Sequence, residues 1–160
     1  MDCCPGRFSV RVLSHQWITP RAEEAKLLGV PRRQLALLRQ VQLLCDNTVC
    51  VYARSIIPLS TLKGRHRRLK YLGDKPLGGY LFAQPNLIRS NQHIAHIVKK
   101  DPLFEIALPE NELNCDQVWG RRSLFSMGDK SLLVSEFFLP ALFKSKIRAK
   151  SLEPTPFEKT

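Results

Sequence analysis

Alternating apolar and polar residues predict strands in the first part of the chain. Residues 8–14 alternate and predict a first strand. Residues 35–45 alternate again, and residues 48–57 are rich in β-forming side chains. Asp46 and Asn47 stand between these two segments and are typical of a tight turn, so we expect an antiparallel hairpin there.

A second hairpin is predicted near the other end of the chain. Residues 121–127 and 132–139 are rich in apolar and β-forming side chains. Gly128 and Asp129 between them supply a turn, so the two segments are expected to pair with each other.

Four short segments outside the hairpins have helical features. The first covers residues 22–28 and is ended by Gly29. Ser60 can cap a helix that runs to residue 72, and Pro76 can open another that runs to residue 82. Residues 87–98 have a weaker helical pattern. Hairpins at both ends with helices between them indicate an α+β fold built on an antiparallel sheet.

The length and composition fit one folded domain. The chain has 160 residues, of which 44% are hydrophobic and 24% charged, as in ordinary globular proteins. No apolar run approaches the roughly 18 residues of a membrane-spanning helix, and residues 1–9 lack the apolar core of a secretory signal. We therefore expect a cytoplasmic, monomeric protein with one domain over residues 8–143 and a basic, mobile tail over 144–160.

Charge makes anionic partners plausible on electrostatic grounds. Twenty-five Lys and Arg against 14 Asp and Glu give a formal net charge of +11. Residues 63–70 hold five basic and no acidic residues, whereas residues 101–116 hold five acidic and no basic ones. We interpret the first as a solvated helix face and the second as a solvated loop. No nucleic acid is expected, and membrane contact is expected only as weak binding of the basic tail to anionic lipid.

Cysteine and histidine spacing does not indicate a metal site. The five cysteines have no C-x-x-C pair, which disfavours both zinc and a disulfide framework, and we expect Cys3 and Cys4 to be free thiols. His93 and His96 stand three residues apart without Cys or carboxylate ligands nearby in the sequence, so we expect no metal there.

Two charged residues lie on apolar strand faces. Arg39 shares its face with apolar side chains, namely Leu35, Leu37, Val41 and Leu43. Glu136 likewise shares its face with Leu132, Val134 and Phe138. A guanidinium removed from water needs anionic or multiple accepting partners. Periodicity leaves two alternatives: a buried ion pair between Arg39 and Glu136, or an enclosed site in which Arg39 binds a substrate carboxylate and Glu136 faces a hydroxyl or a transferable proton.

Four ordered motifs then suggest a family. Arg39 precedes a first block at residues 54–62, and three further blocks follow it in order. The blocks read RSIIPLSTL at 54–62, LGDKPLGGYLF at 72–82, WGRRS at 119–123 and LVSEFFLP at 133–140. Across roughly residues 9–143, the chain resembles chorismate pyruvate-lyase.

The resemblance implies both a fold and a reaction. It implies one domain with an antiparallel, six-stranded sheet and helices packed on it. It also implies a cofactor-independent lyase that converts chorismate to 4-hydroxybenzoate and pyruvate, the first step of ubiquinone biosynthesis. The alternative is a non-catalytic, effector-sensing domain of the same fold that binds a small carboxylate.

The resemblance also implies site residues. Arg39 and the backbone N–H of Leu77 would hold the ring carboxylate, and Glu136 would meet the hydroxyl end. Because chorismate is a dicarboxylate, a second cation is expected near its pyruvyl end. Arg121 and Arg122 are the candidates, and adjacent strand residues face opposite ways, so only one of them can face a pocket.

The chain departs from the family pattern in two places. Family members begin with a few tens of additional residues that form helices and a flap over the pocket. Here only a few residues precede the first predicted strand, so we expect that flap region to be short or missing. The acidic segment within residues 90–117 is also longer than the family pattern implies, and we expect a solvated loop there rather than a substitute lid.

Overall fold

One six-stranded antiparallel sheet organises the molecule. The structure is a computed structural model that describes residues 4, 6–101, 104 and 115–143. The strands are β1 (Phe8–Ile18), β2 (Ala36–Cys45), β3 (Thr48–Pro58), β4 (Leu87–Val98), β5 (Gln117–Met127) and β6 (Lys130–Phe138). Their order in the sheet is β1-β2-β3-β6-β5-β4. The fold is therefore α+β with a six-stranded antiparallel sheet, as predicted.

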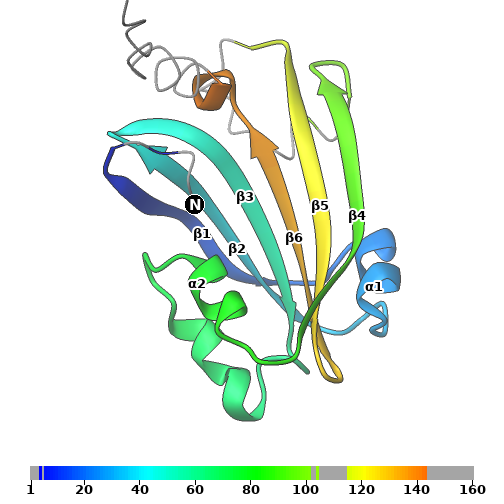
Figure 1. Ribbon diagram of the computed structural model, residues 1–160. Helices are drawn as coiled ribbons and strands as arrows, with labels where there is room; N and C mark the ends of the chain where they lie inside the picture. Colours follow the sequence, from blue (N-terminus) through cyan, green and yellow to red (C-terminus); the bar gives the residue numbers. More distant parts are fainter. Residues whose placement is uncertain (1–3, 5, 102–103, 105–114, 144–160) are drawn as a thin grey trace, which may run out of the picture.

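The sheet consists of two three-stranded meanders joined in the middle. β1, β2 and β3 follow one another along the chain and pair as neighbours, and β4, β5 and β6 do the same. The pairing of β3 with β6 joins the two halves. Strands from both halves of the sequence therefore meet at its centre (Figure 1).

Helical segments pack on both faces of the sheet. The 3₁₀ helix η1 (Gly64–Tyr71) and helix α2 (Leu77–Phe82) connect β3 to β4 and cover the lower part of one face, here called the pocket face (Figure 1). Their buried side chains, such as Leu69 and Leu81, join a core cluster with Leu37, Ile57 and Leu132. Helix α1 (Ala22–Leu28) packs through Leu28 on the opposite face.

Local sequence signals explain both hairpins. Asp46 and Asn47 have φ angles of 47° and 66°, the left-handed pair that a two-residue hairpin turn requires. Gly128 has φ 68° in the β5–β6 turn, and Gly29 has φ 66° at the end of α1. The predicted hairpins and the helix over 22–28 are confirmed.

Three predicted elements need correction. Residues 87–98 form the edge strand β4 and not a helix, because they pair along most of their length with β5. An irregularity between Ser90 and His93 breaks the alternation that would have revealed this strand. The helix expected from Ser60 begins only at Gly64 and is of the 3₁₀ type. The first strand extends beyond Ser14 to Ile18 because it pairs with all of β2.

The prediction that Cys4 is a free thiol was wrong. Cys4 forms a disulfide with Cys45, 41 residues later in the sequence. The β1–β2 register places Phe8 opposite Cys45, which brings the segment before β1 to the end of β2. Cys3 lies outside the described residues, and so do the tail at 144–160 and most of the acidic segment. None of the helices that the structure describes has the length and apolar content needed to span a bilayer.

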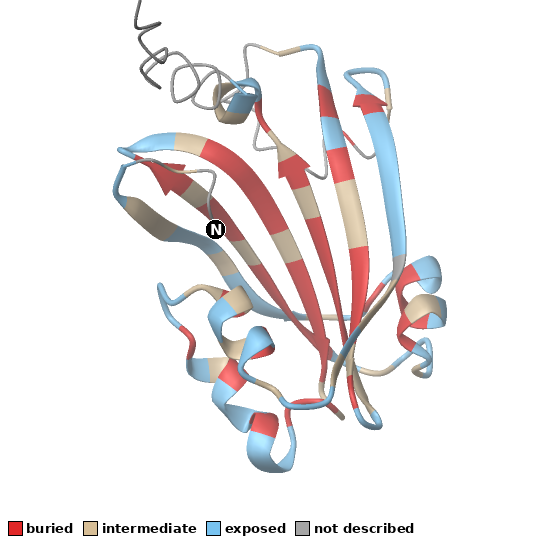
Figure 2. Ribbon diagram, in the orientation of Figure 1, coloured by how far each residue is buried: buried red, intermediate tan, exposed pale blue. Residues whose placement is uncertain are grey.

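The central strands are buried because helical segments pack on both faces of the sheet. In Figure 2 the strands in the middle of the sheet are mostly buried, whereas the edge strand β4 is largely exposed. Charged side chains among the buried residues include Arg39, which is only 2% exposed, and Glu24, which is 3% exposed. A charge that is this deeply buried needs specific partners.

Candidate active site

A pocket of about 230 Å³ lies between the pocket face of the sheet and helix α2. Its polar lining residues are Arg39, Ser55, Arg89, Arg121 and Glu136, and the other lining residues are apolar or glycine. An apolar cavity with a few convergent polar groups is the usual form of a small-molecule site. The volume suits a small ligand.

Arg39 forms one end of this pocket. Its Nη2 atom donates to the carbonyl oxygens of Gly73 and Lys75, at 3.0 and 2.9 Å. Both of these hydrogen bonds use Nη2, so Nε and Nη1 are the atoms left for a ligand. Burial lowers the pKa of Arg39 from its usual value, but an arginine pKa is so high that the group stays charged at neutral pH. The two carbonyls hold a buried cation in a fixed orientation.

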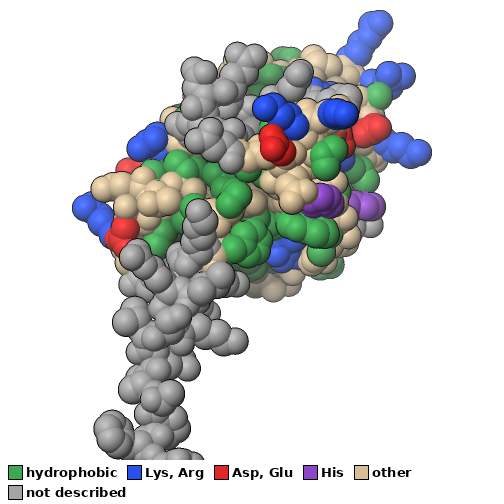
Figure 3. Space-filling view, turned by 90° about the horizontal axis from the view of Figure 1, so that it is seen from above, with side chains coloured by type: hydrophobic (Ala, Val, Ile, Leu, Met, Phe, Trp, Pro, Cys, Tyr) green, Lys and Arg blue, Asp and Glu red, His purple; other side chains and the backbone are tan. Residues whose placement is uncertain are grey.

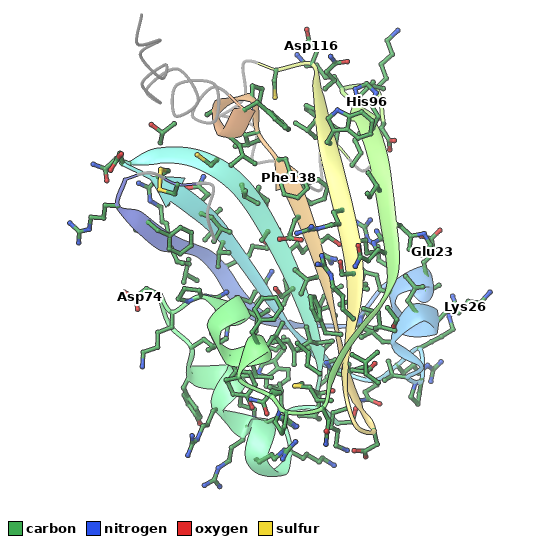
Figure 4. All side chains as sticks on the ribbon, in the orientation of Figure 1. Glu23, Lys26, Asp74, His96, Asp116 and Phe138 are labelled. Carbon is green, nitrogen blue, oxygen red and sulfur yellow. A yellow bond between two sulfur atoms is a disulfide. The ribbon has the colours of Figure 1, made fainter. Side chains whose placement is uncertain are left out.

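Glu136 pairs with Arg121, its neighbour across the β5–β6 ladder. The Oε2 atom of Glu136 accepts from Nε of Arg121 at 2.8 Å and lies 2.8 Å from its Nη2. The Arg121 guanidinium also lies 5.3 Å from the centre of the Phe138 ring, which is labelled in Figure 4. Both bonds use Oε2, so Oε1 is the carboxylate oxygen left for a ligand.

Arg39 and Glu136 do not pair with each other in the described structure. Arg39 lies opposite Ser55, which lies opposite Val134, two residues before Glu136 on β6. Two strand spacings and two residues along a strand put the Cα atoms roughly 12 Å apart. In the described residues Arg39 bonds to carbonyls and Glu136 to Arg121. The ion-pair alternative is therefore wrong, and both residues line the same pocket.

Arg89 is a pocket residue that the sequence interpretation missed. Its Nε and Nη2 atoms donate to Oγ of the buried Ser123, and Nη2 lies 4.0 Å from Oε2 of Glu136. Burial, followed by the charge of Arg121, lowers the pKa of Arg89, whereas Glu136 acts in the opposite direction. The β-branched residues within 87–98 favour a strand. In a strand, the side chain of Arg89 would project from one face of the sheet.

The two remaining predicted residues fall on different sides of the sheet. Leu77 is the first residue of α2, is 8% exposed and lines the pocket. The backbone N–H of a first helical residue has no partner within its helix. Arg122 pairs in register with Ser135 and His93 and does not line the pocket. Of the two adjacent arginines, Arg121 faces the pocket.

The pocket has an excess of positive charge. Three guanidiniums and one carboxylate line it, and the surrounding apolar walls strengthen each electrostatic interaction relative to water. Arg39 stands at one end, and Arg121, Glu136 and Arg89 stand together at the other. The arrangement suits a small molecule with two separated anionic groups.

The strand conformation of β4 keeps His93 and His96 from binding the same metal ion. His93 and His96 are three residues apart on β4, so their side chains point to opposite faces. Within the described ranges, no three His, Cys, Asp or Glu side chains gather into a group that could hold a metal ion. The expectation that no cofactor is needed stays a prediction.

A second depression lies at the other end of the sheet. It is wide and lined in part by His96, Trp119 and Phe143, and the rings of His96 and Trp119 are 5.0 Å apart. Figure 3 views the molecule from this end, where hydrophobic and histidine side chains lie close together. None of the residues that the sequence singled out as catalytic lies there, so the first pocket is the candidate active site.

Comparison with known proteins identifies the family. The family model described as "Chorismate lyase" matches residues 1–148. The chain belongs to the chorismate lyase family. A relative named "Probable chorismate pyruvate-lyase" from Marinobacter nauticus is 42% identical over 145 residues, which cover 91% of this chain and 71% of the relative. Another of the same name from Methylococcus capsulatus is 40% identical, over 87% of this chain and 85% of its own.

Solved structures share the fold at low sequence identity. The ligand-binding domain of a GntR-family transcriptional regulator from Bordetella bronchiseptica has a TM-score of 0.63 and 15% identity, with 84% of each chain covered. The effector domain of PhnF from Mycobacterium smegmatis has a TM-score of 0.61 and 12% identity, over 84% of this chain and 82% of that one. These similarities show that this chain and the two domains share a fold.

Proposed function

We propose that this chorismate lyase family member converts chorismate to 4-hydroxybenzoate and pyruvate without a cofactor. The observation that carries the proposal is the charge pattern of the pocket, with Arg39 at one end and the Arg121–Glu136 pair at the other. Chorismate carries a carboxylate on its ring and a second one on its enolpyruvyl group. Its hydroxyl and enolpyruvyl groups stand on neighbouring ring carbons, away from the ring carboxylate.

The two ends of the pocket match the two ends of this substrate. Arg39 binds the ring carboxylate through Nε and Nη1, assisted by the backbone N–H of Leu77. Arg121, supported by Arg89, binds the enolpyruvyl carboxylate. Glu136 is hydrogen-bonded to Arg121, and this suits it to a hydroxyl on the carbon next to the enolpyruvyl ether. Arg122 is outside the pocket, so we assign it no role in binding.

The reaction needs orientation more than covalent chemistry. The bond between the ring carbon and the ether oxygen breaks, and the hydroxyl-bearing carbon loses its proton. The ring thereby becomes aromatic, and the departing enolpyruvate gains a proton and becomes pyruvate. Aromatisation makes the elimination strongly downhill, so positioning and modest acid–base assistance suffice. Glu136, the carboxylate that lines the pocket, is the group that we propose accepts the hydroxyl hydrogen bond or the proton.

The product of the proposed reaction, 4-hydroxybenzoate, indicates the pathway in which the protein would act. 4-Hydroxybenzoate is the aromatic precursor from which ubiquinone is built, so the reaction would be the first step of that pathway. This role rests on the reaction itself. It is tested by whether a strain that lacks the gene regains ubiquinone when supplied with 4-hydroxybenzoate.

The direct test is an ultraviolet assay of the purified protein with chorismate in the presence of EDTA. We expect 4-hydroxybenzoate and pyruvate to form in equal amounts. A requirement for added metal would overturn the cofactor-independent mechanism. Binding of 4-hydroxybenzoate without turnover of chorismate would instead favour a non-catalytic, effector-sensing domain that uses Arg39 to bind a carboxylate.

A further inference from the structure

A third cavity, a groove lined by arginine side chains, lies between η1 and α2. It encloses about 540 Å³ and is lined by Gly64, Arg65, Arg67, Arg68, Tyr80 and Gln84. It shares no lining residue with the candidate active site. The sequence predicted that the basic segment at 63–70 is a solvated helix face. The fold places the ring of Tyr80, from a different helix, among these arginines.

The three arginines of this groove lack acidic partners. In the described part of the chain, no carboxylate oxygen lies within 4.0 Å of Arg65, Arg67 or Arg68, whereas Arg54 pairs with Glu24 and Arg121 with Glu136. A 3₁₀ helix has three residues per turn, so Arg65 and Arg68 project in the same direction about 6 Å apart along its axis. Like charges held this close repel each other, and a bound anion relieves the repulsion.

The floor of the groove is well fixed. His66, which is 4% exposed, bonds through Nδ1 to the hydroxyl oxygen of Tyr80 at 2.8 Å and so ties η1 to α2. Nε2 of Gln84 donates to the carbonyl oxygen of Tyr80 at 3.1 Å. Burial raises the pKa of Tyr80, and the charges of Arg65 and Arg68 both act against that rise. The phenol therefore stays protonated at neutral pH, within the electrostatic reach of both arginines.

We propose that this groove binds a phosphate-bearing anion through Arg65, Arg67 and Arg68. Guanidinium groups match phosphate oxygens with paired N–H donors, and several of them together compensate a multiply charged phosphoryl group. A soluble phosphate compound and the headgroup of an anionic lipid present the same chemistry. The proposal does not depend on the lyase activity, because the groove and the active-site pocket have separate linings.

The test compares two charge-matched triple variants by calorimetric titration with inorganic pyrophosphate at fixed ionic strength. The first is R65Q/R67Q/R68Q. The control is K26Q/R32Q/R33Q, which removes three exposed cations in and after α1. Figure 4 places Lys26 on the opposite side of the molecule from Asp74, which lies between η1 and α2. We expect the pyrophosphate Kd to rise at least tenfold in the first variant and less than twofold in the control.

Folding of both variants is checked by circular dichroism and thermal unfolding, which do not depend on the proposed lyase activity. Sedimentation with vesicles of phosphatidylcholine containing 20% phosphatidylglycerol then separates the two sources of phosphate. Binding that needs the three arginines and is displaced by pyrophosphate identifies a lipid headgroup. Pyrophosphate binding without vesicle binding identifies a soluble phosphate compound. Equal loss in both variants, or no pyrophosphate binding by the unaltered protein, overturns the proposal.

Discussion

The substitution Glu136→Gln separates a catalytic role of this carboxylate from a structural one. It keeps the shape of the side chain and removes its charge and its acid–base capacity. Because Arg121 donates to Oε2 of Glu136, the oxygen of the new amide can still accept that hydrogen bond. What is lost is the ionic part of the interaction with Arg121 and, more weakly, with Arg89 at 4.0 Å.

The structure limits the cost in stability. The two side chains of the pair are 32% and 21% exposed, so water screens their attraction. We expect a loss of about 1 kcal/mol in the free energy of unfolding, because charge-assisted hydrogen bonds contribute only a little more than neutral ones in such surroundings. For a chain of this size, that corresponds to a fall in Tm of about 2–4 °C.

The expected effect on turnover is much larger. Loss of a general acid or base lowers kcat by about 10²- to 10⁴-fold. The assay measures 4-hydroxybenzoate formation in single turnovers, so that slow product release does not mask the chemical step, and Tm is measured on the same preparation. Glu24→Gln is the control, because Glu24 forms a buried pair with Arg54 outside the pocket. Breaking that pair should cost about 3–5 kcal/mol of stability and leave the kcat of the folded protein unchanged.

Two results would refute this reasoning. A kcat within threefold of the unaltered protein removes Glu136 from the reaction. A Tm that falls by more than about 8 °C while turnover persists would mean that the residue mainly supports the fold.

Three further predictions follow from the same geometry. Arg39→Lys keeps the charge but loses the paired donors, so kcat/KM for chorismate should fall about thirtyfold, roughly 2 kcal/mol, and a near-normal value would move the carboxylate site elsewhere. Arg121→Gln should raise KM for chorismate about tenfold, whereas Arg122→Gln should change it less than twofold. Equal effects would contradict the assignment of Arg121, and not Arg122, to the pocket. Burial, with the charges of Arg65 and Lys130, lowers the pKa of His66, so the unfolded chain takes up this proton more readily than the folded protein. The free energy of unfolding in urea should therefore fall as pH drops below about 6.5, and His66→Gln should flatten this dependence.

The sequence by itself determined the features that depend on near neighbours along the chain. The turns at Asp46-Asn47 and at Gly128 were predictable because a two-residue hairpin needs residues that tolerate positive φ. Side chains alternate between the two faces of a strand, so the placement of Arg39 and Glu136 on apolar faces was predictable too. The four ordered motifs were sufficient to indicate the family.

Only the tertiary structure decided which charges meet. Alternation fixes the face of a side chain but says nothing about the order of strands in the sheet. The β3–β6 and β5–β6 pairings put Arg121, and not Arg39, beside Glu136. The β1–β2 register likewise joined Cys4 to Cys45 across 41 residues.

Arg89 shows the same limit within a single segment. The irregularity between Ser90 and His93 interrupts the alternation of β4, so the local pattern resembles a helix. The strand conformation is chosen by hydrogen bonds to β5, whose residues lie some 30 positions further along the chain. This long-range pairing brings Arg89 to within 4.0 Å of Glu136. The local pattern could not predict it, because a sheet is stabilised mainly by contacts between segments that are distant in the sequence.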